Sequence, residues 1–408
     1  MKRYQWMGIM LSLVLLLCSC GTDKEVEKKA GESTSTPSAT ASVMPLISED
    51  EAFSEAEKIV KTMTIEQKVG QMFLVDLLQL DASPSVDGTA YKATDSMKQA
   101  IIDYHLGGVY LTKENIKSQK QTKKLVQNLQ ASVVSGSALY VAVEEDGGGE
   151  NSISAKVEDL KDTGYVTPKE MGQNMTANQI YESGKTIAGE LTKIGINLNL
   201  APVADLASAQ NPSYAMRCLG SDADGVADLL DDFVSGMREG GLSVTLKTFP
   251  GIGNVSADVT KSIAENTDSL MTIRDTNFVP YASGIQAGAD CVMVSNAAYS
   301  KLTVKKVPAF MSQDIVTKLL REELGFDGIV MTSPLNDNVI ENNYTNEFAV
   351  VEAVKAGCDL IVLPGNFKEC YEALITAVEE GRIDEKVINT SVRRILQNKI
   401  QRGILVLE

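Results

Sequence analysis

Short apolar runs alternate with amphipathic stretches along the chain after residue 47, and this alternation predicts the fold. Runs of four to seven residues read as buried strands, and longer stretches with helical spacing lie between them. The predicted strands are 71–76, 107–112, 139–143, 198–203, 242–248, 291–295, 328–332 and 360–363. The predicted helices include 118–132, 178–194, 223–239, 273–287, 312–323, 346–356 and 367–380.

Regular alternation of strand and helix, with strands apolar on both faces, indicates a parallel sheet covered by helices. Eight such units favour an α/β fold of the closed (β/α)8 TIM-type barrel class, formed by residues 48–408 as a single domain. An open doubly wound sheet is the alternative, because periodicity does not show closure.

The first residues have the pattern of a targeting segment. Lys2 and Arg3 precede an apolar run over 7–17 that is too short to span a bilayer comfortably. The run ends in LCSC, which resembles a bacterial lipobox and predicts a signal peptide over 1–19 with lipidation at Cys20. An ordinary secretory peptide is the alternative. Residues 20–47, rich in Ser, Thr, Pro and charged residues, read as a disordered tether. The expected location is therefore extracytoplasmic, lipid-anchored to the cell membrane.

Composition narrows the partners. The formal net charge is −16, and we find no basic stripe, so nucleic acid is not an expected partner. The single histidine, His105, and scattered cysteines supply no metal ligand set, and no cofactor is expected. Buried free thiols are the expectation for four cysteines, although one disulfide among them stays open: Cys218, Cys291, Cys358 and Cys370. The oligomeric state is not predicted.

Polar residues follow the predicted strands at their carboxyl ends, where the active sites of such barrels lie. The stretch 246–260, LKTFPGIGNVSADVT, is the clearest case, because a buried strand ends in a lysine and a Gly/Pro-rich loop. The rim residues expected from all strands are Asp76, Glu144, Glu145, Asp146, Asp205, Lys247, Asp258, Asn296, Ser333 and Asp337.

Several blocks of the sequence carry a family resemblance. Besides LKTFPGIGNVSADVT, they read TIEQKVGQMF, LGGVYL, VEEDGGG, GINLNLAPVADL, MRCLGSD, LREELGFDGIVMTSPL and AVKAGCDLIVLPG, in this order. Together they resemble glycoside hydrolase family 3, specifically its single-barrel bacterial β-N-acetylglucosaminidases. The resemblance covers residues 50–408.

The resemblance implies a retaining mechanism with a carboxylate nucleophile and a second group that acts as acid and base. The position of the family's nucleophilic aspartate is Ser333, and that of its acid/base histidine is Thr260. Neither hydroxyl replaces the lost function near neutral pH. Asp258, the aspartate that orients the histidine in the family, is retained.

The sugar-binding positions of the family are partly kept. Lys247 and Arg217 match residues that contact the sugar, and Glu144 and Asp146 stand in its acidic motif with altered side-chain lengths. Thr248, Ser152 and Asn296 depart from the family pattern. The implied partner is an N-acetylglucosamine-containing glycan or a muropeptide.

These substitutions predict a barrel related to β-N-acetylhexosaminidases with lost or strongly reduced catalysis. The alternative is a non-catalytic lipoprotein that binds a glycan or a protein partner. Rescue by Asp337, four residues beyond Ser333, is disfavoured. On a helical start Asp337 would lie about one turn away, and the reaction is sensitive to displacements of about 1 Å. An inverting reaction of Asp258 with Glu144 or Asp146 is disfavoured as well.

Overall fold

A computed structural model describes residues 47–133, 138–146, 153–155 and 166–407 of the chain. The chain separates into one unit of residues 1–44 and a second of residues 45–408, and the fold below is that of the second unit. The predicted signal peptide, nearly all of the predicted tether, Cys20, the three glycines at 147–149 and Ser152 lie outside the described residues.

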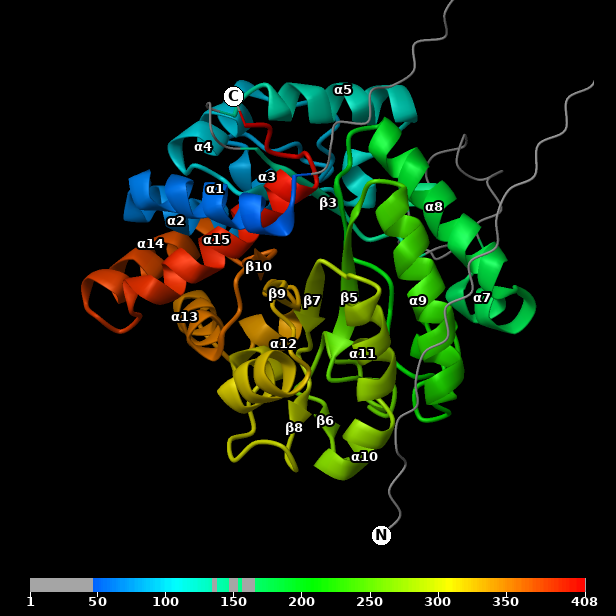
Figure 1. The fold of residues 1–408 in the computed structure, drawn as a ribbon. Helices are drawn as coiled ribbons and strands as arrows, with labels where there is room; N and C mark the ends of the chain where they lie inside the picture. The colour runs from blue at the N-terminus through cyan, green and yellow to red at the C-terminus, as the bar shows by residue number, and fades with distance from the viewer. Residues whose placement is uncertain (1–46, 134–137, 147–152, 156–165, 408) are drawn as a thin grey trace, which may run out of the picture. The chain divides into compact units, whose positions relative to one another are not determined.

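Eight parallel strands form one sheet that closes on itself (Figure 1). The sheet runs in the order β10-β1-β2-β3-β4-β5-β7-β9, and a parallel bridge between Met331 and Leu360 joins its two ends. The amide of Thr332 also donates to the carbonyl of Leu360 at 3.1 Å. The predicted (β/α)8 barrel is therefore confirmed, and the open sheet is excluded. The strands are β1 (Phe73–Asp76), β2 (Gly108–Tyr110), β3 (Tyr140–Val143), β4 (Leu198–Asn199), β5 (Ser243–Phe249), β7 (Cys291–Val294), β9 (Ile329–Thr332) and β10 (Ile361–Val362).

Helices cover the outside of the barrel between successive strands (Figure 1). They are α1 (Glu49–Thr62), α2 (Ile65–Gln71), α3 (Leu77–Leu80), α4 (Asp95–Asp103), α5 (Gln119–Gln130), α7 (Pro168–Asn174), α8 (Ala177–Lys193), α9 (Ala223–Glu239), α10 (Leu270–Asp275), α11 (Phe278–Gln286), α12 (Asn338–Glu341), α13 (Asn346–Ala356), α14 (Phe367–Glu379) and α15 (Glu385–Gln401). A helix of π type, η5, spans Asp314–Glu323. Short 3-10 turns are η1 (Lys113–Asn115), η2 (Ile153–Ala155), η3 (Tyr214–Arg217) and η4 (Ala309–Met311), and two further strands, β6 (Glu265–Asn266) and β8 (Ala298–Tyr299), pair separately. No helix within the described residues is both long and apolar enough to cross a bilayer.

Two predicted elements differ from the structure. The helix predicted at 273–287 is two helices, α10 and α11, because Thr276 leaves helical geometry at φ −125° and ψ −79°. The strand predicted at 198–203 ends at Asn199. Beyond Asn199 the backbone still bonds to its neighbours at single points: the amide of Leu200 donates to the carbonyl of Val143 at 2.8 Å, and Val203 forms one bridge to Lys247.

Close helix packing requires glycine at one point of contact. Helices α8 and α9 lie side by side in Figure 1 and make extensive contact. A Cβ atom on Gly236 of α9 would come within 2.0 Å of the carbonyl oxygen of Tyr181 on α8. Only glycine lets the two backbones approach this closely.

A buried lysine hydrogen-bonds to residues at the amino-terminal end of the barrel. Lys399 of α15 donates to Gln71 Oε1 and to the carbonyl of Gly107, both at 2.8 Å, and its Nζ lies 4.8 Å from the centre of the Tyr140 ring. Burial lowers the pKa of Lys399 to about 7. His105, which precedes β2, lies at this end, away from the carboxyl ends of the strands.

Lysines do gather at one surface cavity, which corrects the expectation of no basic stripe. The cavity, of about 630 Å³, lies beside α5 and is lined by Lys92, Lys117, Lys120 and Lys124 around Tyr91. These lysines come from two separate segments, around residue 92 and over residues 117–124, which the fold brings to one cavity.

All four cysteines of the described region are free and buried: Cys218, Cys291, Cys358 and Cys370. Burial raises the pKa of each thiol above its ordinary value. The expected buried free thiols are confirmed, and no disulfide joins them.

Candidate functional site

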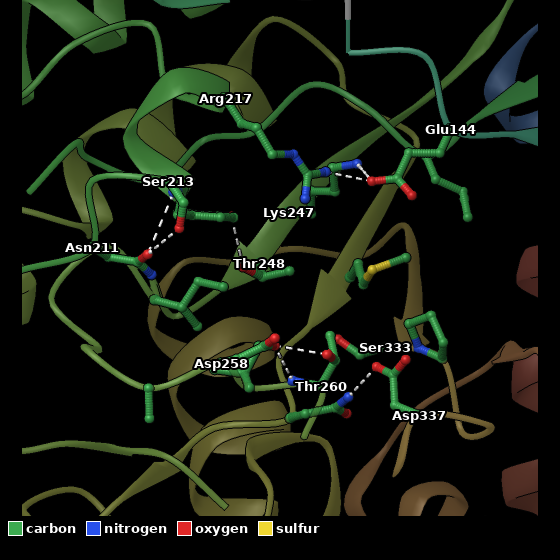
Figure 2. A pocket seen from close by; sticks show the side chains of 18 of the residues that line it. Glu144, Asn211, Ser213, Arg217, Lys247, Thr248, Asp258, Thr260, Ser333 and Asp337 are labelled. Carbon is green, nitrogen blue, oxygen red and sulfur yellow. Dashed lines mark hydrogen bonds and ion pairs between the residues drawn. The ribbon is translucent and has the colours of Figure 1, made fainter. Parts of the chain in front are cut away.

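The carboxyl ends of the strands surround a cavity of about 610 Å³ (Figure 2). Its walls come from segments that follow β2, β3, β4, β5, β7 and β9, so residues distant in sequence converge there. The lining residues are Tyr110, Glu144, Leu200, Asn211, Ser213, Tyr214, Arg217, Lys247, Thr248, Ile252, Ser256, Ala257, Asp258, Val259, Thr260, Met293, Asn296, Ser333, Pro334 and Asp337.

An irregularity in β5 brings two neighbouring side chains to the cavity. Successive residues of a strand normally point to opposite faces of the sheet. The register of β5 with β7 shifts between Lys247 and Phe249, so that Lys247 pairs with Met293 and Phe249 with Val294. Lys247 and Thr248 both line the cavity as a result.

Four charged side chains form a compact cluster on one wall of the cavity. Lys247 Nζ lies 2.7 Å from Glu144 Oε1 and 2.9 Å from Asp146 Oδ1. The guanidinium of Arg217 donates to Asp146 Oδ2 at 2.8 Å through Nε, and it also pairs with Glu144. Two cations thus balance two carboxylates, and Figure 2 shows Arg217 and Lys247 converging on Glu144.

This cluster keeps both carboxylates ionised. Burial alone would raise the pKa of Glu144, but Lys247 and Arg217 outweigh burial and lower it. The pKa of Asp146 is lowered in the same way, by Arg217 and Lys247 against burial. Neither carboxylate can act as a general acid near neutral pH, because both have lost their proton.

Asp205 was expected on the rim, but it is buried beneath the loop after β5. Its two oxygens accept from the hydroxyls of Tyr281, Tyr214 and Thr248, each at 2.8 Å. The amides of Thr248 and Ile252 also donate to it, at 3.2 and 3.1 Å. Asp205 therefore fixes the start of the loop and is not available to a ligand.

Asp258 and Thr260 hydrogen-bond to each other on the side of the cavity opposite the charged cluster. The hydroxyl of Thr260 donates to Asp258 Oδ1 at 2.7 Å, and Lys261 Nζ lies 2.9 Å from Asp258 Oδ2. The Thr260 hydroxyl and Lys261 lower the pKa of Asp258 to about 2. Asp258 is therefore ionised and cannot donate a proton, which removes it as a general acid.

The side chain of Ser333 is engaged with the barrel wall. Its hydroxyl donates to the carbonyl of Val294 on β7 at 2.9 Å, and its amide donates to the same carbonyl at 2.9 Å. A nucleophilic serine needs a base that takes its proton. The proton of Ser333 instead goes to a backbone carbonyl, which is no base.

Asp337 lines the cavity, and its carboxyl group is a weaker acid than that of an ordinary aspartate. Its Oδ2 accepts from Asn296 Nδ2 at 2.8 Å. Burial, and then the carboxylates of Asp258 and Glu144, raise the pKa of Asp337 to about 7. Asp337 thus exists in both protonation states near neutral pH.

The structure brings most predicted site residues together. Those that line this cavity are Glu144, Arg217, Lys247, Thr248, Asp258, Thr260 and Ser333. Asp146 does not line it but forms ion pairs with Arg217 and Lys247. Cys20 lies outside the described residues.

Other lining residues were not predicted. Tyr110 is the last residue of β2, but the strand was predicted to run to residue 112, so its place at a carboxyl end was not visible in the sequence. Asn211, Ser213 and Tyr214 come from the irregular segment before Arg217, which carries no periodic signal. No group of three or more His, Cys, Asp or Glu side chains within the described part is arranged to hold a metal ion.

Residues 64–398, most of the chain, match the family described as "Glycosyl hydrolase family 3 N terminal domain". The chain belongs to glycosyl hydrolase family 3. The family resemblance of the sequence blocks is thereby confirmed.

Relatives with this barrel include named hexosaminidases. Beta-hexosaminidase A of Pseudoalteromonas piscicida is 26% identical over 369 residues, 83% of this chain and 61% of that protein. A beta-hexosaminidase of Xylella fastidiosa strain M23 is 29% identical over 266 residues, 64% of this chain and 77% of that protein. The chain thus spans less than two thirds of the first of these relatives.

Solved structures agree with this assignment. A family 3 beta-N-acetylglucosaminidase from Paenibacillus sp. FPU-7 matches with a TM-score of 0.76 and 29% identity, over 85% of this chain and 64% of that one. A beta-N-acetylhexosaminidase from Beutenbergia cavernae matches with a TM-score of 0.71 and 28% identity, over 83% of this chain and 98% of that one. The barrel is therefore of the hexosaminidase-like type of family 3.

Proposed function

We propose that this family 3 barrel binds an N-acetylglucosamine-containing glycan, such as a cell-wall fragment, with lost or strongly reduced hydrolysis. The glycan would occupy the 610 Å³ cavity at the carboxyl ends of the strands. Arg217 and Lys247 would face its hydroxyl or carbonyl oxygens, and Glu144 would accept from its hydroxyls.

The observation that carries this proposal is how the two hydroxyls at the catalytic positions are bonded. Ser333 donates to the carbonyl of Val294, and Thr260 donates to the ionised Asp258. A retaining hydrolase needs a nucleophile and a proton donor, and neither hydroxyl is placed to become one. The cation–carboxylate cluster that would hold a sugar is complete by contrast.

Magnitudes support weak or absent turnover. A general acid alone contributes about 10² to 10⁴ in rate, and loss of a nucleophile costs further orders of magnitude. A barrel that lacks both keeps only the contribution of binding and positioning.

We also propose an extracytoplasmic location, with the chain anchored to the membrane by lipid on Cys20 and the barrel held off by the tether of residues 20–47. The support is the basic and apolar pattern of residues 1–20 with its lipobox-like end. Incorporation of labelled palmitate into the expressed full chain, lost in Cys20→Ser, tests this. No incorporation would contradict it.

Calorimetric titration tests the binding proposal. N-acetylglucosamine oligosaccharides and muropeptides should give saturable heats with the wild-type protein and at least tenfold weaker binding with Arg217→Ala. Arg274→Ala is the matched control, because Arg274 pairs with Glu323 on the surface away from the cavity. If none of these glycans gave a heat of binding with the wild-type protein, the proposal would be contradicted and a protein partner would be favoured.

A further inference from the structure

One wall of the cavity gathers hydrogen-bond acceptors. The hydroxyl of Ser333 gives its only proton to Val294, which leaves it as an acceptor toward the cavity. Asn296 is 1% exposed and donates through Nδ2 to Asp337, so its Oδ1 points elsewhere. That Oδ1 is buried and has no hydrogen-bond partner among the described residues.

An unpartnered buried acceptor points to a missing donor. Leaving such a group unsatisfied costs about 1–3 kcal/mol, so buried acceptors are normally bonded to protein, water or ligand. Asn296 and Asp337 line the same cavity as Ser333. A ligand group with several N–H or O–H donors would satisfy all three side chains at once.

The charges around this wall favour a cation. The carboxylates of Asp258 in the loop after β5, Glu144 after β3 and Glu341 on α12 all act on Asp337. The cations of the cavity are engaged elsewhere: Lys261 with Asp258, and Arg217 and Lys247 with Glu144 and Asp146. The carboxyl group of Asp337 has only the neutral Asn296 as a hydrogen-bond partner among the described residues.

We propose that the wall formed by Ser333, Asn296 and Asp337 binds an ammonium group, so that the glycan held in this cavity carries a hexosamine with a free amine. This inference rests on the proposed glycan binding and specifies its substrate class. An ammonium group offers three donors to the three acceptors and neutralises Asp337. An acetamido group offers one donor and would place its carbonyl oxygen among acceptors, which is unfavourable.

Binding of a cation should be linked to protons. Because Asp337 has a pKa of about 7, a fraction of the protein carries its proton at neutral pH. An ammonium ligand stabilises the carboxylate and expels that proton. Affinity for the amine should therefore fall as the pH drops from 7 to 5.5, and binding at pH 6, where the hexosamine amine is already protonated and Asp337 still holds most of its proton, should release protons.

The test uses the homotrisaccharides of N-acetylglucosamine, of glucosamine and of glucose, each titrated calorimetrically at pH 6 in two buffers of different ionisation enthalpy. We expect the glucosamine trisaccharide to bind at least tenfold more tightly than the N-acetylated one, with proton release. Asp337→Asn should abolish both the preference and the release. Asp314→Asn, a surface aspartate paired with Lys318, should change neither.

The outcomes separate this inference from the proposed function. Equal or tighter binding of the N-acetylated trisaccharide, unaffected by Asp337→Asn, would overturn the inference and leave glycan binding intact. Equal binding of the glucosamine and glucose trisaccharides would also overturn it, because hydroxyl donors would then suffice. Failure of all three trisaccharides and of the muropeptides to bind would overturn both.

Discussion

At the scale of residues, the cavity depends on a charged cluster built around one buried lysine. The side chain of Lys247 is only 3% exposed, and together with Arg217 it balances the charges of Glu144 and Asp146. A buried charge is tolerated only while its partner remains, because desolvation is not otherwise compensated. The cluster therefore links binding capacity to stability.

Lys247→Met tests this link. It keeps the apolar stem but leaves two carboxylates facing only Arg217, so the free energy of unfolding should fall by about 3–5 kcal/mol. Urea unfolding at pH 7 measures the change. Lys185→Met is the control, since Lys185 pairs with Glu239 on the surface and should change stability by less than about 1 kcal/mol. Equal effects of both variants would contradict the account.

A second prediction at this scale concerns pH. The folded-state pKa of Asp337 is raised to about 7, above its ordinary value, so the folded protein holds a proton that the unfolded chain loses. Ionisation of Asp337 therefore costs stability as the pH rises from about 4 to 7. Asp337→Asn should match the wild type at pH 4 and exceed it by up to about 4 kcal/mol at pH 8. A difference that is the same at both pH values would contradict this prediction.

At the scale of elements, the site depends on how β5 joins its loop. The irregularity at Thr248 turns two consecutive residues toward the cavity, and Asp205 holds the backbone there through the amides of Thr248 and Ile252. The segment after β4 thus positions the segment after β5. Neither contact is visible in the periodicity of either strand.

Asp205→Ala should loosen this junction. Three hydroxyls and two amides would lose their acceptor, so we expect a loss of about 3 kcal/mol or more in unfolding free energy and at least tenfold weaker glycan binding. Asp222→Ala is the matched control. It removes only the N-cap of α9 and should cost about 1 kcal/mol without affecting binding. Unchanged binding in Asp205→Ala would contradict this role.

Elements with a strong periodic signal were predictable, and irregular ones were not. Helices α9 and α13 have the predicted bounds, because the apolar spacing and the capping residues that define them lie within each segment's own sequence. The division between α10 and α11 depends on a single residue, Thr276, whose backbone geometry overrides the apolar pattern. Bounds therefore failed where one backbone geometry decided them.

At the scale of the molecule, closure of the barrel brings the site together. The bridge between Met331 and Leu360 joins the first and last strands of the sheet. Sequence blocks could indicate which residues belong to the rim, but not which of them turn inward. Asp205 lies beneath the rim, whereas Asp337, four residues past Ser333 at the start of α12, enters the cavity.

Restoring the two substituted positions tests whether the frame of a hydrolase remains. Ser333→Asp with Thr260→His should give measurable hydrolysis of an aryl N-acetyl-β-glucosaminide, because Asp258 is in place to orient the histidine. Either single substitution should give much less, since a retaining path needs both groups. Activity in Ser333→Asp alone equal to that of the double variant would contradict the role assigned to position 260.

The same assay on the wild-type chain tests the central claim most directly. Purified wild-type protein should release aryl alcohol from an aryl N-acetyl-β-glucosaminide no faster than the variant Asp258→Ala, while it still binds N-acetylglucosamine oligosaccharides in the calorimeter. Turnover comparable to that of an intact family 3 beta-N-acetylglucosaminidase, abolished by Asp258→Ala or Asp337→Asn, would contradict the account.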